Sequence, residues 1–234
     1  MAFQIYRSDQ ARPVRGVLFD MDGVVLDTEK LYARFWREAA EEQGYTMSYE
    51  QALGMRSLNN EAGQAKLEEY FGPGVSRQRF RQIRIRRMDA YTDVYGVDPK
   101  PGIFELLDYL DGRGIKKAIT TSSPVERVEK YLKPLGLFDR FDCICSGHQV
   151  PKGKPEPDIY LYGAACLGLR PEECLALEDS YTGILSAHRA GCMAVMIPDL
   201  DQPDERTMKL LLAKADGSMD LIGALELGAK DSGV

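Results

Sequence analysis

The chain has 234 residues, of which 44% are hydrophobic and 28% are charged, so it can bury one large core and a smaller inserted unit. A formal net charge of -6 suits neither nucleic acid nor an anionic membrane surface, and we expect neither as a partner. The sequence contains no run with the character of a signal peptide or a membrane-spanning helix, so the expected location is the cytoplasm.

The first part of the chain predicts one strand followed by helices. Residues 14–19 end in a short apolar run that is typical of a buried parallel strand. Residues 29–43 predict an amphipathic helix, because apolar side chains recur there at helical spacing. Helical patterns continue over residues 49–95, with breaks at Gly54 and at residues 72–74. The absence of any convincing strand pattern predicts an all-helical segment here.

From residue 97 onwards, strands and helices alternate. The predicted strands cover residues 116–120, 141–145, 174–177 and 194–197, and the predicted helices cover residues 103–113, 125–135, 158–167 and 183–190, the last closed by Gly191. This alternation implies right-handed crossovers and a parallel sheet with helices on both faces. We predict a Rossmann-like α/β catalytic core of residues 1–28 and 97–234, with a small helical cap domain of residues 29–96 inserted after the first strand.

Acidic residues follow the first predicted strand. Asp20 and Asp22 leave its end, and Gly23 lets the chain bend after them. An isolated aspartate at such a place would commonly be a turn or a helix cap, but two close carboxylates repel each other and favour a cation or a shared proton. Because parallel sheets bind ligands at the carboxyl ends of their strands, a hard oxygen-binding ion such as Mg²⁺ would fit here.

Three further strand ends carry polar groups. Hydroxyl groups at residues 120–123 could cradle an anion together with backbone N–H groups, or they could be simple N-caps. Lys154 could reach back over the sheet edge, or it could be a solvated lysine. Glu178 and Asp179 could belong to a surface loop, but beside the first acidic pair they are better explained as metal ligands.

Taken in order, these strand ends resemble the motifs of the haloacid dehalogenase superfamily of phosphohydrolases. The matching segments are DxDGVxxDT at residues 20–28, Thr-Thr-Ser-Ser at 120–123, GKPxPD at 153–158 and LEDS at 177–180. The helical insertion is similar to the small cap of that family. The subgroup that the sequence most resembles is the β-phosphoglucomutase-like phosphatases.

The resemblance implies a role for each matching residue. Asp20 would be the nucleophile, and Asp22 would be the general acid and base, with its backbone carbonyl on the metal. Thr121 and the backbone N–H of Ser122 would hold the phosphoryl oxygens, and Lys154 would neutralise them. The implied Mg²⁺ site comprises Asp20, Asp22, Glu178 and Asp179.

The implied function is Mg²⁺-dependent hydrolysis of a small phosphorylated metabolite, such as a sugar phosphate, through an aspartyl phosphate. The presence of Asp22 disfavours hydrolytic dehalogenation, because the relatives that dehalogenate lack this acid. A phosphomutase of the β-phosphoglucomutase type is the closest alternative. Those enzymes carry a histidine one turn before a cap tryptophan, whereas Tyr32 precedes Trp36 here.

A non-catalytic protein that binds a phosphorylated ligand is the alternative from a different class. The complete set of acids disfavours it, because degenerate relatives usually lose one. Within the cap, the candidate substrate contacts are Thr28, Tyr32 and Arg56. We expect a monomer.

Five cysteines lie in the second half of the chain, at positions 143, 145, 166, 174 and 192. Their odd number and the absence of a CxxC pair argue against a zinc ribbon or a thioredoxin-type site. Cys143 and Cys145 should share one face of a strand, because side chains alternate along a strand. We expect all five to be free thiols in a reducing cytosol.

Overall fold

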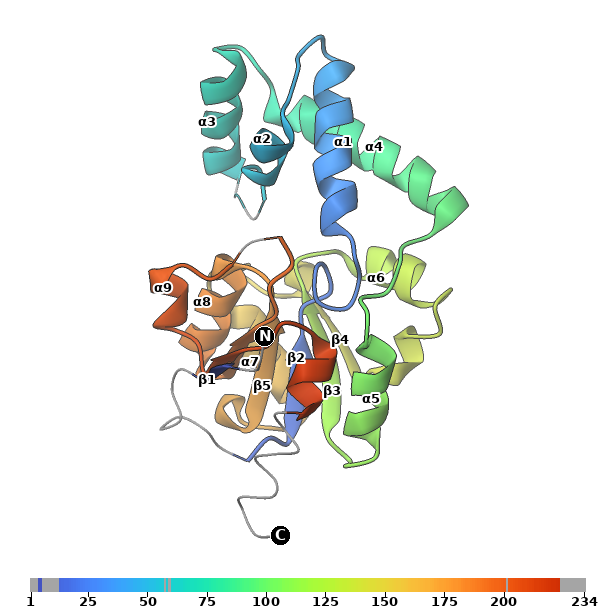
Figure 1. Cartoon of the computed structure of the whole chain (residues 1–234), viewed down its shortest axis with the longest axis vertical. Helices are drawn as coiled ribbons and strands as arrows, with labels where there is room; N and C mark the ends of the chain where they lie inside the picture. Colours follow the sequence, from blue (N-terminus) through green and yellow to red (C-terminus); the bar gives the residue numbers. More distant parts are fainter. Residues whose placement is uncertain (1–3, 6–12, 57, 59, 201, 224–234) are drawn as a thin grey trace. The chain divides into compact units, whose positions relative to one another are not determined.

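The computed structural model describes residues 4–5, 13–56, 58, 60–200 and 202–223. The chain divides into two compact units, each described by itself below (Figure 1). Unit 1 consists of residues 1–26 and 99–234, and unit 2 consists of residues 27–98. The division into a catalytic core of residues 1–28 and 97–234 and a cap domain of residues 29–96 stays a prediction.

Unit 1 is built on a seven-stranded sheet in the order β1-β7-β6-β5-β2-β3-β4. The strands are β1 (Gln4–Ile5), β2 (Gly16–Phe19), β3 (Lys116–Thr121), β4 (Cys143–Ser146), β5 (Cys174–Glu178), β6 (Met193–Met196) and β7 (Ala213–Lys214). Strands β2 to β7 are parallel, and β1 pairs antiparallel with β7. The predicted parallel sheet is confirmed, while the two-residue strands β1 and β7 were not predicted because they are too short to show a pattern.

The helices of unit 1 lie close to their predicted positions. The predicted ones are α5 (Ile103–Asp111), α6 (Val125–Leu132), α7 (Asp158–Cys166) and α8 (Tyr181–Ala190), while the four-residue helix α9 (Glu205–Met208) was not predicted. Short 3-10 turns lie at Phe138–Arg140, Gly147–Gln149 and Pro171–Glu173. Helix α6 ends at Leu132, earlier than predicted, because Pro134 has no backbone N–H with which to continue the helical hydrogen bonds. Gly191 caps α8 in the left-handed conformation, as predicted. In the described part of the chain, no helix is both long and apolar enough to cross a membrane.

Helices cover both faces of the sheet. On one face, Leu18 of β2 lies in a buried cluster with Ile159 of α7 and Ile184 of α8. Helices α5 and α6 contact β3 and β4, and they contribute no described residue to that cluster. Since side chains alternate along β2, its neighbours Val17 and Phe19 face the other side, where Phe19 packs edge-on against Phe141 at 5.5 Å between ring centroids.

The register of the central strands fixes which residues meet at the sheet edge. Phe19 of β2 pairs with Ile119 of β3 on one side and with Leu177 of β5 on the other. The residues that follow these, namely Asp20 after the end of β2, Thr120 in β3 and Glu178 at the end of β5, therefore lie at the same level of the sheet. Figure 1 shows β2 between β5 and β3, so groups at this edge converge on the end of β2.

Unit 2 contains the helices α1 (Glu29–Glu41), α2 (Tyr49–Leu53), α3 (Asn60–Phe71) and α4 (Arg77–Tyr95). Helix α1 packs against α4, and an aromatic core joins the elements. Phe71 and Phe80 stack at 5.8 Å between centroids, and Trp36 lies 6.3 Å from Phe80. The predicted breaks are found where Gly54 ends α2 and where Gly72 and Gly74 take positive φ angles after α3.

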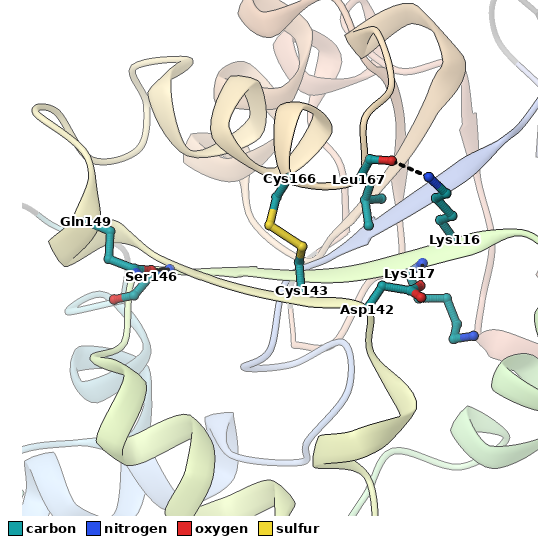
Figure 2. Close-up of a disulfide and its surroundings, with 8 residues drawn as sticks. All are labelled: Lys116, Lys117, Asp142, Cys143, Ser146, Gln149, Cys166 and Leu167. Atoms are coloured by element: carbon teal, nitrogen blue, oxygen red, sulfur yellow. Dashed lines mark hydrogen bonds between the residues drawn. A yellow bond between two sulfur atoms is a disulfide. The ribbon is translucent and has the colours of Figure 1, made fainter.

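A disulfide joins Cys143 of β4 to Cys166 at the end of α7, with the two Cα atoms 6.4 Å apart (Figure 2). The prediction of five free thiols is therefore wrong for this pair, while Cys145, Cys174 and Cys192 are free and buried. The partners are 23 positions apart, and only the packing of α7 on β4 brings them within bonding range. Cys143 and Cys145 lie on the same core cluster, as predicted.

Candidate active site

Three buried carboxylates meet at the carboxyl edge of the sheet. Asp20 follows β2, Glu178 ends β5, and Asp179 follows it. One carboxylate oxygen of each lies within 4.8 Å of the others. All three residues are buried, so Glu178 and Asp179 do not belong to an exposed surface loop. Oxygen atoms at this spacing could hold a metal cation.

Backbone contacts fix the local path of both acidic segments. The N–H of Asp20 donates to the carbonyl of Leu177 at 2.9 Å, which ties the end of β2 to β5. Gly23 has a φ of 81°, and a Cβ atom there would lie 2.6 Å from Oδ2 of Asp179. Only glycine combines this left-handed conformation with so close an approach. The absence of a side chain at Gly23 therefore makes room for the Asp179 carboxylate.

Lys154 bridges two of the carboxylates. Its Nζ donates to Oδ1 of Asp20 at 2.6 Å, to Oε1 of Glu178 at 2.6 Å and to the carbonyl of Thr120 at 3.0 Å. These bonds use all three protons of the ammonium group. The Lys154 side chain is only 8% exposed, which excludes the alternative of a solvated lysine.

The charges of this cluster are strongly coupled. Burial raises the pKa of Asp20 to about 8; Lys154 opposes the rise, and Glu178 and Asp22 add to it. Burial also opposes the charge of Lys154, but Asp20 and Glu178 outweigh it and hold the lysine pKa above its usual value. Three carboxylates face one ammonium, so a further cation would relieve the repulsion between them. The donors are all oxygen atoms, which fits a hard ion such as Mg²⁺.

The hydroxyl groups at the end of β3 and just after it are not helix caps. The N-cap of α6 is Pro124, and no side chain caps that helix. Thr121 is buried, and its Oγ1 accepts a bond from the N–H of Ser123 at 3.1 Å. Ser123 in turn donates from Oγ to Oδ2 of Asp22 at 3.3 Å, and Ser122 is exposed. Asp22 is thus held beside the hydroxyl segment, and its carboxylate is not part of the three-carboxylate cluster.

Of the candidate residues of unit 2, one is fully buried and the other two contact charged groups of the same unit. Thr28 is fully buried at the start of α1. Nε of Arg56 lies 2.8 Å from Oε2 of Glu29, and both side chains are largely buried. The ring of Tyr32 has the Arg84 guanidinium over it at 4.8 Å. That Thr28, Tyr32 and Arg56 take part in substrate recognition stays a prediction.

Two residues of the site were missed by the sequence analysis. Tyr160 is fully buried and donates its hydroxyl to Oε1 of Glu178. Burial, followed by the charges of Glu178 and Asp20, raises the Tyr160 pKa well above its usual value, so the phenol stays a proton donor. At Gly183 of α8, a Cβ atom would overlap the Glu178 carboxylate. The sequence prediction began this helix at Gly183, whereas the observed helix begins at Tyr181 and includes the glycine, which is the kind of position where close packing requires a missing side chain. An aromatic residue at helical spacing, such as Tyr160, indicates only a core position.

Comparisons with known proteins agree with this geometry. Residues 14–191 match the family model for haloacid dehalogenase-like hydrolases. Hexitol phosphatase B of Escherichia coli (strain K12) is 30% identical over 226 residues, which cover 94% of this chain and 97% of that protein. The phosphorylated carbohydrates phosphatase of Thermotoga maritima is 31% identical over 179 residues, covering 76% and 82% of the two chains.

A solved structure shares the fold. β-Phosphoglucomutase from Clostridium difficile matches with a TM-score of 0.70 and 22% identity, covering 88% of this chain and 92% of that one. At this level of identity, the likeness concerns the arrangement of the elements alone.

Proposed function

This chain belongs to the haloacid dehalogenase-like hydrolase family and is a phosphatase, and on that premise we propose that it hydrolyses small phosphomonoesters of the sugar phosphate class. The proposed reaction requires Mg²⁺ and passes through an aspartyl phosphate on Asp20. One observation carries the proposal: a buried lysine bridges Asp20 and Glu178 within a group of three carboxylates. The names of the two relatives support phosphorylated carbohydrates or hexitols as the substrate class.

Charge neutralisation is the first task of such a site, because a phosphate dianion repels an attacking carboxylate. Lys154 places a positive charge 2.6 Å from Asp20, where it would neutralise a phosphoryl group that Asp20 attacks. Asp20, Glu178, Asp179 and the backbone carbonyl of Asp22 would hold the Mg²⁺. The bound ion would supply further positive charge to the phosphoryl oxygens during transfer.

The covalent step is assigned to Asp20. An oxygen of Asp20 attacks phosphorus in line as the bond to the leaving alkoxide breaks, and Thr121 and Ser122 hold the phosphoryl oxygens. Asp22 gives its proton to the alkoxide. The same carboxylate then accepts a proton from the water that hydrolyses the aspartyl phosphate. The Ser123 bond supports this role, since it holds the Asp22 carboxylate beside the segment proposed to bind phosphate.

We further propose that unit 2 is a cap that excludes water and reads the non-phosphate end of the substrate. Thr28, Tyr32 and Arg56 are its candidate substrate contacts. A sugar phosphate presents hydroxyl groups, so a tyrosine and an arginine are suitable hydrogen-bonding partners for it. We expect the enzyme to act as a monomer in the cytoplasm.

Phosphomutase activity is the second candidate, and one observation bears on it. Tyr32 occupies the place, one turn before Trp36, where the resemblance leads us to expect a histidine in the mutases. The Tyr32 ring lies under the Arg84 guanidinium, which fixes it within the helical unit. A phenol is a poor acid or base near neutral pH, so it cannot replace a histidine that moves protons.

The test is a phosphate-release assay on hexitol phosphates, sugar phosphates and p-nitrophenyl phosphate, with Mg²⁺ and with EDTA. We expect release that stops with EDTA and returns with Mg²⁺. Asp20→Asn should lower turnover by at least about 10³-fold, because an amide does not form the covalent intermediate. The matched control is Asp108→Asn in α5, at a side chain that is 72% exposed. Circular dichroism checks that both variants fold.

Each part of the proposal has an outcome that contradicts it. Full activity of Asp20→Asn would exclude covalent catalysis by this residue, and turnover in EDTA would exclude the metal. Formation of a sugar phosphate isomer with a bisphosphate activator, without phosphate release, would make the protein a mutase. Binding of substrates without any turnover would make it a phospho-ligand binding protein.

A further inference from the structure

A buried tyrosine lies behind the carboxylate cluster. Tyr160, in the first turn of α7, donates its hydroxyl to Oε1 of Glu178, which also accepts the 2.6 Å bond from Lys154. We propose that Tyr160 is a positioning residue, which orients Glu178 and Lys154 for binding of the divalent cation. This inference rests on the proposed function, because it assigns a task to a residue that does not itself touch substrate or metal.

The two oxygens of Glu178 have different surroundings. Oε1 accepts two strong bonds, one from the Tyr160 phenol and one from the Lys154 ammonium. Oε2 accepts a longer bond of 3.3 Å from the hydroxyl of Ser180. The terminal torsion of a glutamate is broad and has no strong intrinsic preference. The donors on Oε1 therefore decide the plane of the carboxylate, and this leaves Oε2 as the oxygen with capacity for a cation.

Packing restricts Glu178 from the opposite side. Gly183 of α8 lies so close that a Cβ atom there would overlap the Glu178 carboxylate. The carboxylate is thus held between the backbone of α8 and the phenol of α7. Because the Glu178 side chain is 1% exposed, bulk water cannot replace a donor that is lost.

Tyr160 also contacts the lysine. The ammonium of Lys154 lies 5.3 Å from the centre of the Tyr160 ring, within the range of a cation–π interaction. The ring belongs to the core cluster that includes Leu18 of β2 and Ile184 of α8, so its position is fixed by packing. Ring and hydroxyl therefore act on different partners: the ring contacts Lys154, and the hydroxyl orients Glu178.

The isosteric substitution Tyr160→Phe separates positioning from packing. It keeps the ring, and with it the core contacts and the contact with Lys154, while it removes the bond to Glu178. Groups that orient metal ligands typically change metal affinity by 10–100-fold when they are removed. We expect Tyr160→Phe to weaken Mg²⁺ binding by about tenfold or more. A residue that only fills the core would leave Mg²⁺ binding unchanged.

The experiment measures Mg²⁺ binding by titration calorimetry on the substrate-free protein, together with kcat/KM for phosphate release. The matched control is Tyr162→Phe, which removes the same hydroxyl from the same helix at a residue that is 37% exposed. We expect Tyr160→Phe to lose Mg²⁺ affinity and kcat/KM together, and Tyr162→Phe to match the wild type in both.

The outcomes separate the inference from the function on which it rests. If the wild type binds Mg²⁺ and releases phosphate while Tyr160→Phe is within twofold of it in both, the inference alone is overturned. If the wild type does neither, the proposed function fails, and the inference fails with it. If circular dichroism shows that Tyr160→Phe does not fold, the hydroxyl is part of the core structure, and the positioning role is overturned.

Discussion

Two networks of carboxylates and cations in this chain differ in burial and in their balance of charges, and the pKa of a central carboxylate shifts in opposite directions in them. In unit 1, Lys154 binds Asp20 and Glu178 where all three side chains are 11% exposed or less. In unit 2, Arg86 and Arg87 bind Glu42 at 2.6 and 2.7 Å, with side chains that are 29–64% exposed. The pKa of Asp20 is raised to about 8, chiefly by burial, whereas hydrogen bonds from Arg86 and Arg87 lower the pKa of Glu42.

The difference shows what burial does to an ion pair. At the surface, water solvates Glu42 and its arginine partners, and the hydrogen bonds from the arginines stabilise the charged form of Glu42 a little further. In the buried cluster, the desolvation penalty of the charged carboxylates exceeds the attraction that the Lys154 ammonium provides. An additional positive charge would therefore stabilise their charged form. The exposed network is balanced without a further ion, while the buried carboxylates could hold a further cation.

Removal of the bridging cation should have the largest effect. Lys154→Met leaves two buried carboxylates without their ammonium partner, so we expect the free energy of unfolding to fall by about 3–5 kcal/mol. We expect kcat/KM for phosphate release to fall by about 10²–10³-fold. Urea denaturation and the phosphate assay measure the two effects. Lys152→Met, at an exposed lysine of the same loop, is the control. Equal behaviour of the two variants would show that burial does not distinguish these lysines.

An intermediate effect should follow from removal of the covalent tie around the buried network. The disulfide spans 23 positions that contain both Lys154 and Tyr160. Cys143→Ser combined with Cys166→Ser should lower the free energy of unfolding by about 3 kcal/mol, through the greater freedom of the unfolded chain. We expect kcat/KM to stay within about twofold, because the hydrogen bonds of Lys154 do not involve either cysteine.

The thiols of the wild type provide the control for this variant. Without reductant, the denatured wild type should show three reactive thiols, corresponding to the free cysteines Cys145, Cys174 and Cys192. After reduction, it should show all five and unfold like the double variant. Five reactive thiols without reductant would mean that the disulfide is not formed in solution.

The smallest effect should come from the exposed network. Glu42→Gln removes the carboxylate that binds Arg86 and Arg87, yet we expect Tm to fall by about 2 °C or less. Salt should reduce this difference further, because exposed charges are screened. Glu41→Gln, at the neighbouring exposed glutamate of α1, is the control. A fall in Tm as large as that of Lys154→Met would contradict the comparison.

The strand ends of the site were predictable because they depend on short-range patterns. The apolar run before Asp20 and the run before Glu178 each identify a strand locally. Parallel pairing then puts the next residues at one sheet edge, whatever their distance along the chain. This is why the acids and Lys154 could be grouped in advance, even though Lys154 lies 134 positions from Asp20.

Other features had no comparable local signal. The arginines of α4 show a helical spacing, but nothing in their pattern selects Glu38 of α1 and Glu42, the C-cap of that helix, as partners for Arg87. The prediction that Cys143 and Cys166 are free thiols was wrong, because pairing depends on a distance that no spacing reveals. The predicted roles of Thr28, Tyr32 and Arg56 also depend on long-range geometry, and they stay predictions.

The sequence by itself determined the parallel sheet, the helical insertion and the set of residues at the carboxyl ends of the strands. Its periodicities are local, and the handedness of crossovers leaves few ways to arrange the strands. Only the tertiary structure decided that Tyr160 donates to Glu178, that Gly183 leaves room for this carboxylate, and that α7 is tied to β4 by a disulfide. The reason is that a dense interior fixes contacts between distant residues to within a few tenths of an ångström, and no repeating pattern along the chain encodes distances of that kind.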